Sequence, residues 1–170
     1  MSTLIQPHGG VLKDRMLGAE QAKALKAEAV NFVSWDLTER QLWDMEMLLS
    51  GAFSPLEGFM GKADYDGVVK DMRLASGLLW SMPITLDVTE EFSDKLKKGA
   101  KVALRDPEGV LIAVLTVSDI WTPDKQAEAV NVFKTTDDFH PGVNYLMNKA
   151  HKVYVGGSLD GVEMPNHYDF

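Results

Sequence analysis

The chain has 170 residues, of which 45% are hydrophobic and 25% are charged, and it contains no cysteine. This composition is ordinary for a soluble globular protein, and the lack of cysteine excludes a disulfide framework, a thiolate nucleophile and a cysteine-based metal site. With 25 acidic and 17 basic residues the formal net charge is −8, which argues against nucleic acid or an anionic membrane as a partner, because attraction to phosphate needs the opposite sign.

The N-terminal part of the chain is predicted to contain an arm, a helix and a strand. Residues 4–12 are expected to be extended, with a turn at 7–10, where proline and glycine favour a reversal. His8 is either a residue of that turn or a ligand, but no second histidine stands at metal-binding spacing. The composition of 19–30 is typical of a surface helix, and apolar and polar residues alternate in 32–37 as in a short strand.

Residues 38–51 are predicted to form a helix with well-defined ends. Thr38 and Gln41 have the spacing of a capping box, in which each side chain binds a backbone N–H of the first turn. Apolar residues then recur at helical spacing, and Gly51 stands where a left-handed residue commonly ends a helix. The apolar stripe consists of Leu42, Met45, Leu48 and Leu49.

The loop that follows, 52–60, is rich in large apolar residues and in residues that fix turns. Irregular segments of this kind are packed elements and often carry function. We expect the loop to close the end of a hydrophobic core, and the alternatives are direct contact with a ligand or an exposed docking role. The structural and docking candidates are Gly51, Phe53, Pro55, Leu56, Gly58, Phe59 and Met60.

The middle of the chain is predicted to contain a helix at 65–72, a strand at 84–88 and a short capped helix at 89–96. The clearest strands lie within 101–121 and flank Pro107-Glu108-Gly109, whose proline and glycine suit a tight reversal. The second of these strands is almost wholly apolar up to Val117, so we expect it to be buried and to bend or change partners.

The remainder of the chain is predicted to be helical at 123–132 and 141–147, with a strand at 153–155 that ends in a turn at Gly156-Gly157. Short strands, one hairpin and scattered short helices do not alternate as in a doubly wound sheet. The pattern predicts a single α+β domain over 1–170, in which a small mixed β-barrel is decorated with short helices.

The sequence shows no signal for a membrane or for export. No apolar run approaches the length that spans a bilayer. The first ten residues, MSTLIQPHGG, lack the basic region and apolar core of a signal peptide. We therefore expect a cytoplasmic protein with no membrane partner.

No motif with catalytic or cofactor chemistry stands out. The glycines of 58–62 are too closely spaced for a phosphate-binding loop, and those of 156–161 lack dinucleotide-binding spacing. The histidines lack the i, i+4 spacing of a helical metal site. Asp137-Asp138 before His140 has a cation site as its alternative, but we favour a charged surface loop. We assign no catalytic, cofactor-binding or metal-binding residue in this chain.

The chain does carry segments that are typical of a known family. It contains, in order, LIQPHGG, LTERQLWDMEMLLSGAFSPLEGFM, MRLASGLLWSMPITLDV, VALRDPEG, VLTVSDIWTPDK, HPGVNYL and VYVGGSL. This order closely resembles the N-terminal domain of the ATP sulfurylase (sulfate adenylyltransferase) family over essentially the whole chain, and GAFSPLEGFM is specific to that family and its fused relatives. The resemblance implies a PUA-like barrel. One departure is Lys134, where the family commonly has glycine.

The resemblance implies a parent enzyme that interconverts ATP (with Mg) and sulfate with adenosine 5′-phosphosulfate and pyrophosphate. The family's Gln-x-Arg-Asn, His-x-x-His and Gly-Arg-Asp motifs belong to the next domain, and none occurs here. The implied role is therefore that of a non-catalytic domain, inactive alone, whose partner is the catalytic domain of the same homo-oligomeric enzyme. The expected docking face is the loop 52–60 together with the tail 153–170.

PUA-like domains elsewhere bind RNA, so a stand-alone RNA-binding module is the alternative. RNA recognition needs a basic groove with exposed aromatic side chains. The excess of acidic residues disfavours it, and we expect no RNA affinity at physiological salt.

Overall fold

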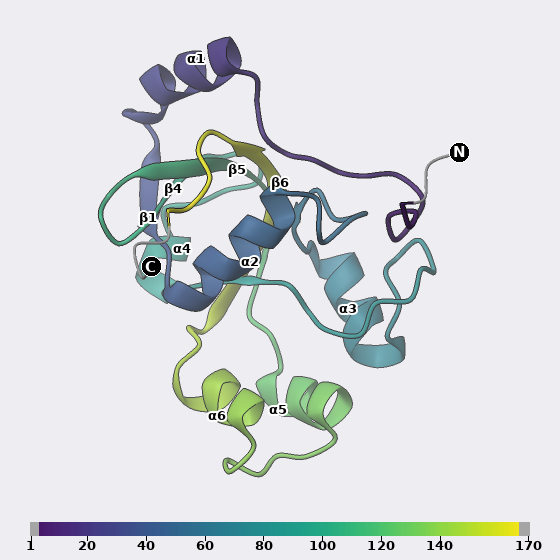
Figure 1. The fold of residues 1–170 in the computed structure, drawn as a ribbon. Helices are drawn as coiled ribbons and strands as arrows, with labels where there is room; N and C mark the ends of the chain where they lie inside the picture. The colour runs from purple at the N-terminus through teal and green to yellow at the C-terminus, as the bar shows by residue number, and fades with distance from the viewer. Residues whose placement is uncertain (1–3, 167–170) are drawn as a thin grey trace. The chain divides into compact units, whose positions relative to one another are not determined.

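The computed structural model describes residues 4–166, and Figure 1 shows the order of their helices and strands. The chain divides into two compact units, each assembled from separate stretches of sequence. Within the described residues, the first unit comprises 4–59, 99–117 and 157–166, and the second comprises 60–98 and 118–156. The helices are α1 (Ala19–Ala29), α2 (Glu39–Leu49), α3 (Lys62–Asp71), α4 (Glu90–Ser93), α5 (Lys125–Glu128), the π-helix η1 (Ala129–Phe133) and α6 (Pro141–Asn148). The strands are β1 (Val33–Asp36), β2 (Gly58–Phe59), β3 (Leu86–Val88), β4 (Lys101–Arg105), β5 (Leu111–Trp121) and β6 (Val153–Gly161).

The strands of the first unit pair in the order β1-β4-β5-β6-β2. β1 runs parallel to β4, whereas β4 and β5 form the predicted antiparallel hairpin and β2 runs antiparallel to β6. The α+β class is therefore confirmed. The described strands leave β1 and β2 as the two ends of this path, so the pairing gives a mixed sheet and does not close the expected barrel.

The β4–β5 hairpin and helix α1 contribute to the core of the first unit. Gly109 has a left-handed φ of 88° in the turn, and β5 is buried at nearly every position up to Val117, as predicted. The last turn of α1 contributes Ala29 to a cluster with Ala103 of β4 and Val114 of β5. Burial of these aliphatic side chains supplies about 25 cal/mol per Å² of apolar surface removed from water.

Helix α2 has the ends that its sequence predicts. The Thr38 hydroxyl accepts from the Gln41 backbone N–H at 3.3 Å, and the Gln41 side chain accepts from the Thr38 N–H at 3.1 Å. Gly51 follows the helix with a φ of 80°. Met45 and the two leucines of the last turn are completely buried, while Leu42 is half-buried.

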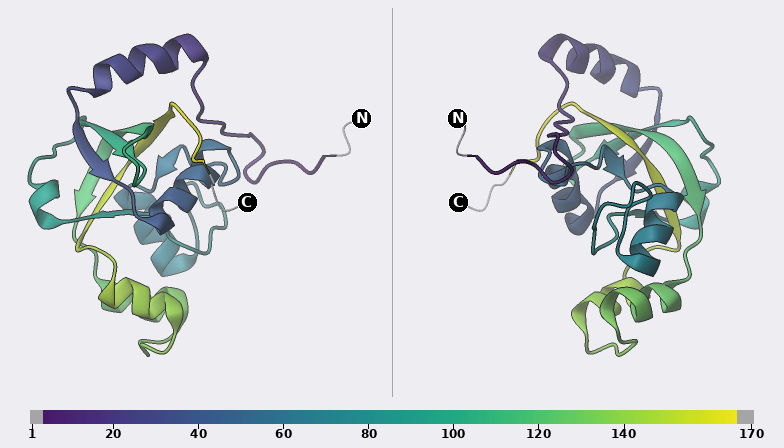
Figure 2. Two further views of the ribbon diagram at one scale, coloured as in Figure 1. Left: turned by 60° about the vertical axis from the view of Figure 1, so that its left-hand side comes forward. Right: turned by 90° about the vertical axis from the view of Figure 1, so that its right-hand side faces the viewer.

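The second unit combines a small strand pair with short helices. β3 pairs antiparallel with the first half of β6, with Leu86 opposite Val155. Helices α5 and α6 lie side by side in both views of Figure 2, and the buried contacts of Ala129 with Val143 and Leu146 hold η1 against α6.

Three local expectations differ from the structure. The segment 123–132 is not one α-helix, because it changes at Ala129 from α5 to the π-helix. α3 begins at Lys62 because the Asp119 carboxylate accepts from its backbone N–H at 3.3 Å, a cap that comes from a distant segment. Gly156-Gly157 is not a turn but lies inside β6. A side chain at Gly157 would place its Cβ 2.2 Å from the Thr116 carbonyl oxygen, so glycine here permits a close backbone approach.

We predict that Phe59→Ala lowers the free energy of unfolding by about 3–5 kcal/mol, through lost transfer energy and the cavity left behind. The Phe59 side chain is 2% exposed. Phe53 is only half-buried, so Phe53→Ala serves as the matched comparison and should cost about half as much. Urea unfolding of both variants tests this, and equal losses would mean that burial does not set the difference.

We further predict that Lys134→Gly stabilises the chain. Lys134 ends η1 with a φ of 61°, the left-handed conformation that disfavours residues with a Cβ. Relief of about 1–2 kcal/mol of strain exceeds the roughly 0.4–1 kcal/mol lost to the greater unfolded-state freedom of glycine. Lys134→Ala removes the charge but keeps the strain, so its midpoint in thermal melts should stay at or below that of the parent chain. A Lys134→Gly midpoint no higher than that of Lys134→Ala would contradict the strain argument.

Candidate anchoring and docking site

The predicted loop residues fall into two groups by burial. Phe53 and Pro55 are half-buried, and the Ser54–Pro55 peptide bond is cis. The buried candidates are Gly51, Leu56, Gly58, Phe59 and Met60. The half-buried pair leaves part of the loop open to a neighbour, and a docking role for it stays a prediction.

Two glycines of the loop allow other segments to approach closely. A Cβ at Gly58 would stand 2.0 Å from the Gly157 carbonyl oxygen, where β2 pairs with β6. A Cβ at Gly51 would meet the Leu12 side chain at 2.9 Å. Gly58 therefore has no room for a side chain, because the backbone of β6 fills the space beside its Cα.

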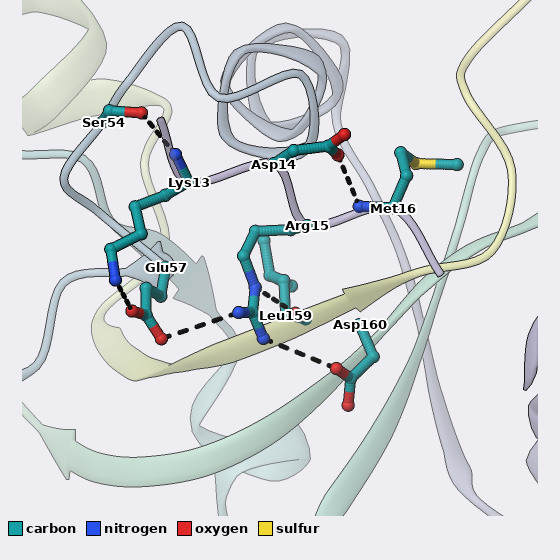
Figure 3. Close-up of polar contacts among 8 residues, drawn as sticks. All are labelled: Lys13, Asp14, Arg15, Met16, Ser54, Glu57, Leu159 and Asp160. Atoms are coloured by element: carbon teal, nitrogen blue, oxygen red, sulfur yellow. Dashed lines mark hydrogen bonds and ion pairs between the residues drawn. The ribbon is translucent and has the colours of Figure 1, made fainter. Parts of the chain in front are cut away.

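Ser54 joins the loop to the N-terminal arm, and sequence reasoning did not identify it. Its side chain is buried and donates from its hydroxyl to the Gly51 carbonyl oxygen at 2.6 Å. The same hydroxyl oxygen accepts from the Lys13 backbone N–H at 2.9 Å (Figure 3). A buried hydroxyl with both roles satisfied fixes the position of the two segments it links.

Charged side chains add a second link beside Ser54. The Lys13 ammonium lies 2.7 Å from one carboxylate oxygen of Glu57, and the Arg15 guanidinium lies 3.6 Å from the other. Arg15 also reaches Asp160 at 3.5 Å and donates from Nε to the Leu159 carbonyl oxygen at 2.9 Å. Figure 3 shows Arg15 between Glu57 and the end of β6. Both basic side chains are thus already engaged by carboxylates.

Backbone hydrogen bonds complete the anchor. The Arg15 N–H donates to the Leu49 carbonyl oxygen at 3.0 Å, and its carbonyl accepts from the Gly161 N–H at 2.9 Å. The Leu17 N–H donates back to the Gly161 carbonyl at 2.9 Å. Residues 13–17 are consequently held between the end of α2 and the end of β6.

The pKa of Glu57 is lowered, chiefly by the hydrogen bond from the Lys13 ammonium, and burial only partly offsets this. A carboxylate with a lowered folded-state pKa contributes stability above its ordinary pKa of 4.5, and the contribution is lost as pH falls through the lowered value. Glu57 is substantially exposed, so water and salt screen the contribution. The network positions the arm more than it stabilises the fold.

The second unit holds a buried polar group that sequence reasoning also missed. The Glu128 carboxylate accepts from the Tyr65 hydroxyl at 2.7 Å and from the Tyr154 hydroxyl at 3.1 Å. Burial, followed by the negative charge of Glu128, raises the pKa of Tyr65. The rings of Tyr65, Tyr154 and Trp121 pack at centroid distances of 5.4–5.9 Å. Because the partners of this carboxylate are tyrosines of the protein core, the cluster is a core element.

A cavity of about 320 Å³ lies beside this cluster. The charged residues among its walls are Lys62, Asp66 and Asp124, and Lys62 is paired with Asp66. Two carboxylates and one paired ammonium do not suit a polyphosphate, because such ligands are bound by clustered positive charge and backbone N–H groups.

The described residues were searched for groups of metal-ligating side chains and for membrane-spanning helices. Between residues 4 and 166, no three His, Asp or Glu side chains gather where they could hold a metal ion. Asp137 instead accepts from the Phe139 N–H at 3.0 Å, and His140 caps α6. Within the same stretch, no helix combines the length and hydropathy needed to cross a bilayer.

The docking tail predicted at 153–170 begins as strand β6, and its residues 167–170 lie outside the described part.

Comparison with known proteins places these features in a family. The sulfate adenylyltransferase of Eremothecium gossypii is 48% identical over 168 residues, which are 98% of this chain and 33% of that protein. The sulfate adenylyltransferase of Yarrowia lipolytica is 51% identical over 168 residues, which are 96% of this chain and 29% of that protein. This chain thus spans about a third of the length of the curated relatives it matches.

A solved structure, the hexameric APS kinase from Thiobacillus denitrificans, is similar to this chain with a TM-score of 0.76 and 33% identity. The match covers 98% of this chain and 28% of that one. The model of the PUA-like domain family matches residues 5–164. Since this match includes nearly every described residue, the chain belongs to the PUA-like domain family.

Proposed function

We propose that this chain is the N-terminal, non-catalytic domain of a sulfate adenylyltransferase. The parent enzyme interconverts ATP and sulfate with adenosine 5′-phosphosulfate and pyrophosphate. The observation that carries the proposal is identity of 45–52% over nearly the whole chain to enzymes of that name, of which the chain spans about a third. This domain supports the catalytic domain of the same polypeptide and covers part of its surface.

The chemistry of the reaction supports a non-catalytic role. Attack at phosphorus depends on positioning and on positive charge around the phosphates. The basic side chains nearest the predicted loop, Lys13 and Arg15, are paired with carboxylates. Gly58 and Gly157 belong to glycine pairs whose spacing does not fit a phosphate-binding loop, and both stand against backbone carbonyls. The substrate ATP, with its Mg, is therefore assigned to the parent's catalytic domain.

The proposal extends to the organisation of the parent. We propose that residues 1–170 act as one domain of the PUA-like barrel type. The parent is cytoplasmic and homo-oligomeric, and the similar Thiobacillus protein, which is named as hexameric, supports the oligomer. A stand-alone RNA-binding module is less well supported, because the net charge of −8 repels a phosphate backbone.

The test joins this chain to the part of the Eremothecium gossypii enzyme that it does not match. We predict that the separate 170-residue chain forms no ATP from adenosine 5′-phosphosulfate and pyrophosphate in a luminometric assay. The joined protein should form ATP, because the catalytic groups reside in the added part.

The intact Eremothecium enzyme and its unmatched part alone are the controls. Turnover by the separate chain above a no-protein blank would show that it carries catalytic groups of its own. An inactive, though folded, joined protein would mean that the chain does not serve as this domain.

A further inference from the structure

The N-terminal arm, residues 4–12, presents aliphatic side chains that are largely exposed in the described structure. Ile5 is 96% exposed, Val11 is 60% exposed and Leu12 is 57% exposed. Single exposed aliphatic residues are normal on protein surfaces. Here four exposed aliphatic residues, Leu4 included, occur in one nine-residue segment, LIQPHGGVL, which contains no Asp, Glu, Lys or Arg although a quarter of the chain is charged.

The arm also has a defined backbone conformation. The Gly10 N–H donates to the Pro7 carbonyl oxygen at 2.8 Å, which closes a turn between the two apolar ends. Gly9 and Gly10 have left-handed φ values of 78° and 86°. At its base the arm is fixed by the buried hydroxyl of Ser54 and by the salt bridge of Lys13. A segment held in this way meets a partner with less loss of conformational freedom than a free terminus.

We propose that this arm is a docking element that inserts its aliphatic side chains into an apolar surface on the remaining polypeptide of the same enzyme. The proposal rests on the proposed function. The matched regions are only 33% of the Eremothecium relative and 28% of the Thiobacillus chain, so each of those proteins has a larger body of polypeptide attached to the same domain.

Attachment within one polypeptide favours this occupant over a second copy of the chain. Linked segments meet at effective concentrations of about millimolar, so a small contact is enough to hold them together. A stable interface between separate proteins uses about 20–30 residues on each side, many more than the arm provides.

Hydrogen exchange of residues 4–12 tests the proposal, measured on the separate chain and on the joined protein described above. We expect exchange in the joined protein to be slower by at least about tenfold. The double variant Ile5→Asp/Val11→Asp should return exchange to the rate of the separate chain. Val30→Asp is the matched control, since Val30 is 75% exposed but lies outside the arm, and it should leave the protection intact.

The outcomes separate this proposal from the proposed function. Thermal melts of the separate chain should be unchanged by the double variant, because Ile5 and Val11 are exposed, so lost protection cannot be ascribed to unfolding. An active joined protein with an unprotected arm would overturn the docking role alone. Protection that appears in the separate chain and grows with its concentration would assign the arm to a second copy. An inactive joined protein would remove the proposed function and this inference with it.

Discussion

Close approach between backbones at β6 is the constraint on which the rest of the structure depends. β6 pairs with β2 and β3, and it is adjacent to β5 in the sheet order. A Cβ at Gly157 would lie 2.2 Å from the Thr116 carbonyl oxygen, and one at Gly156 would lie 2.3 Å from the Met60 carbonyl oxygen. Contacts this short leave no space for a methyl group, so glycine is required at both positions. Without these contacts the loop 52–60 would lose the strand against which it packs.

The same constraint limits the chemistry of the chain. The glycines of β2 and β6 stand against backbone carbonyl groups, and the cations nearby are already matched by Glu57 and Asp160. The contacts around Arg15 have a structural role, because they hold residues 13–17 between α2 and β6. A fixed base for the apolar arm is consistent with the proposed role as a supporting, non-catalytic domain.

Local signals in the sequence were enough to predict much of the fold. The capping box of Thr38 and Gln41 and the hairpin turn depend on residues within a few positions of each other, so both could be recognised. The anchoring site could not, because Lys13 meets Ser54 and Arg15 meets Asp160 across 41 and 145 positions. The glycines of β6 were predicted as a turn for the same reason, since the backbones that press on them come from distant segments.

We propose that this domain supports the catalytic domain of its parent enzyme without itself binding the reactants. Isothermal titration calorimetry of the separate chain against ATP and against adenosine 5′-phosphosulfate tests it most directly, since binding would be detected even without turnover. We expect no saturable heat up to about 1 mM ligand, which corresponds to a binding free energy weaker than about −4 kcal/mol. Saturable binding of either nucleotide in the micromolar range would contradict it.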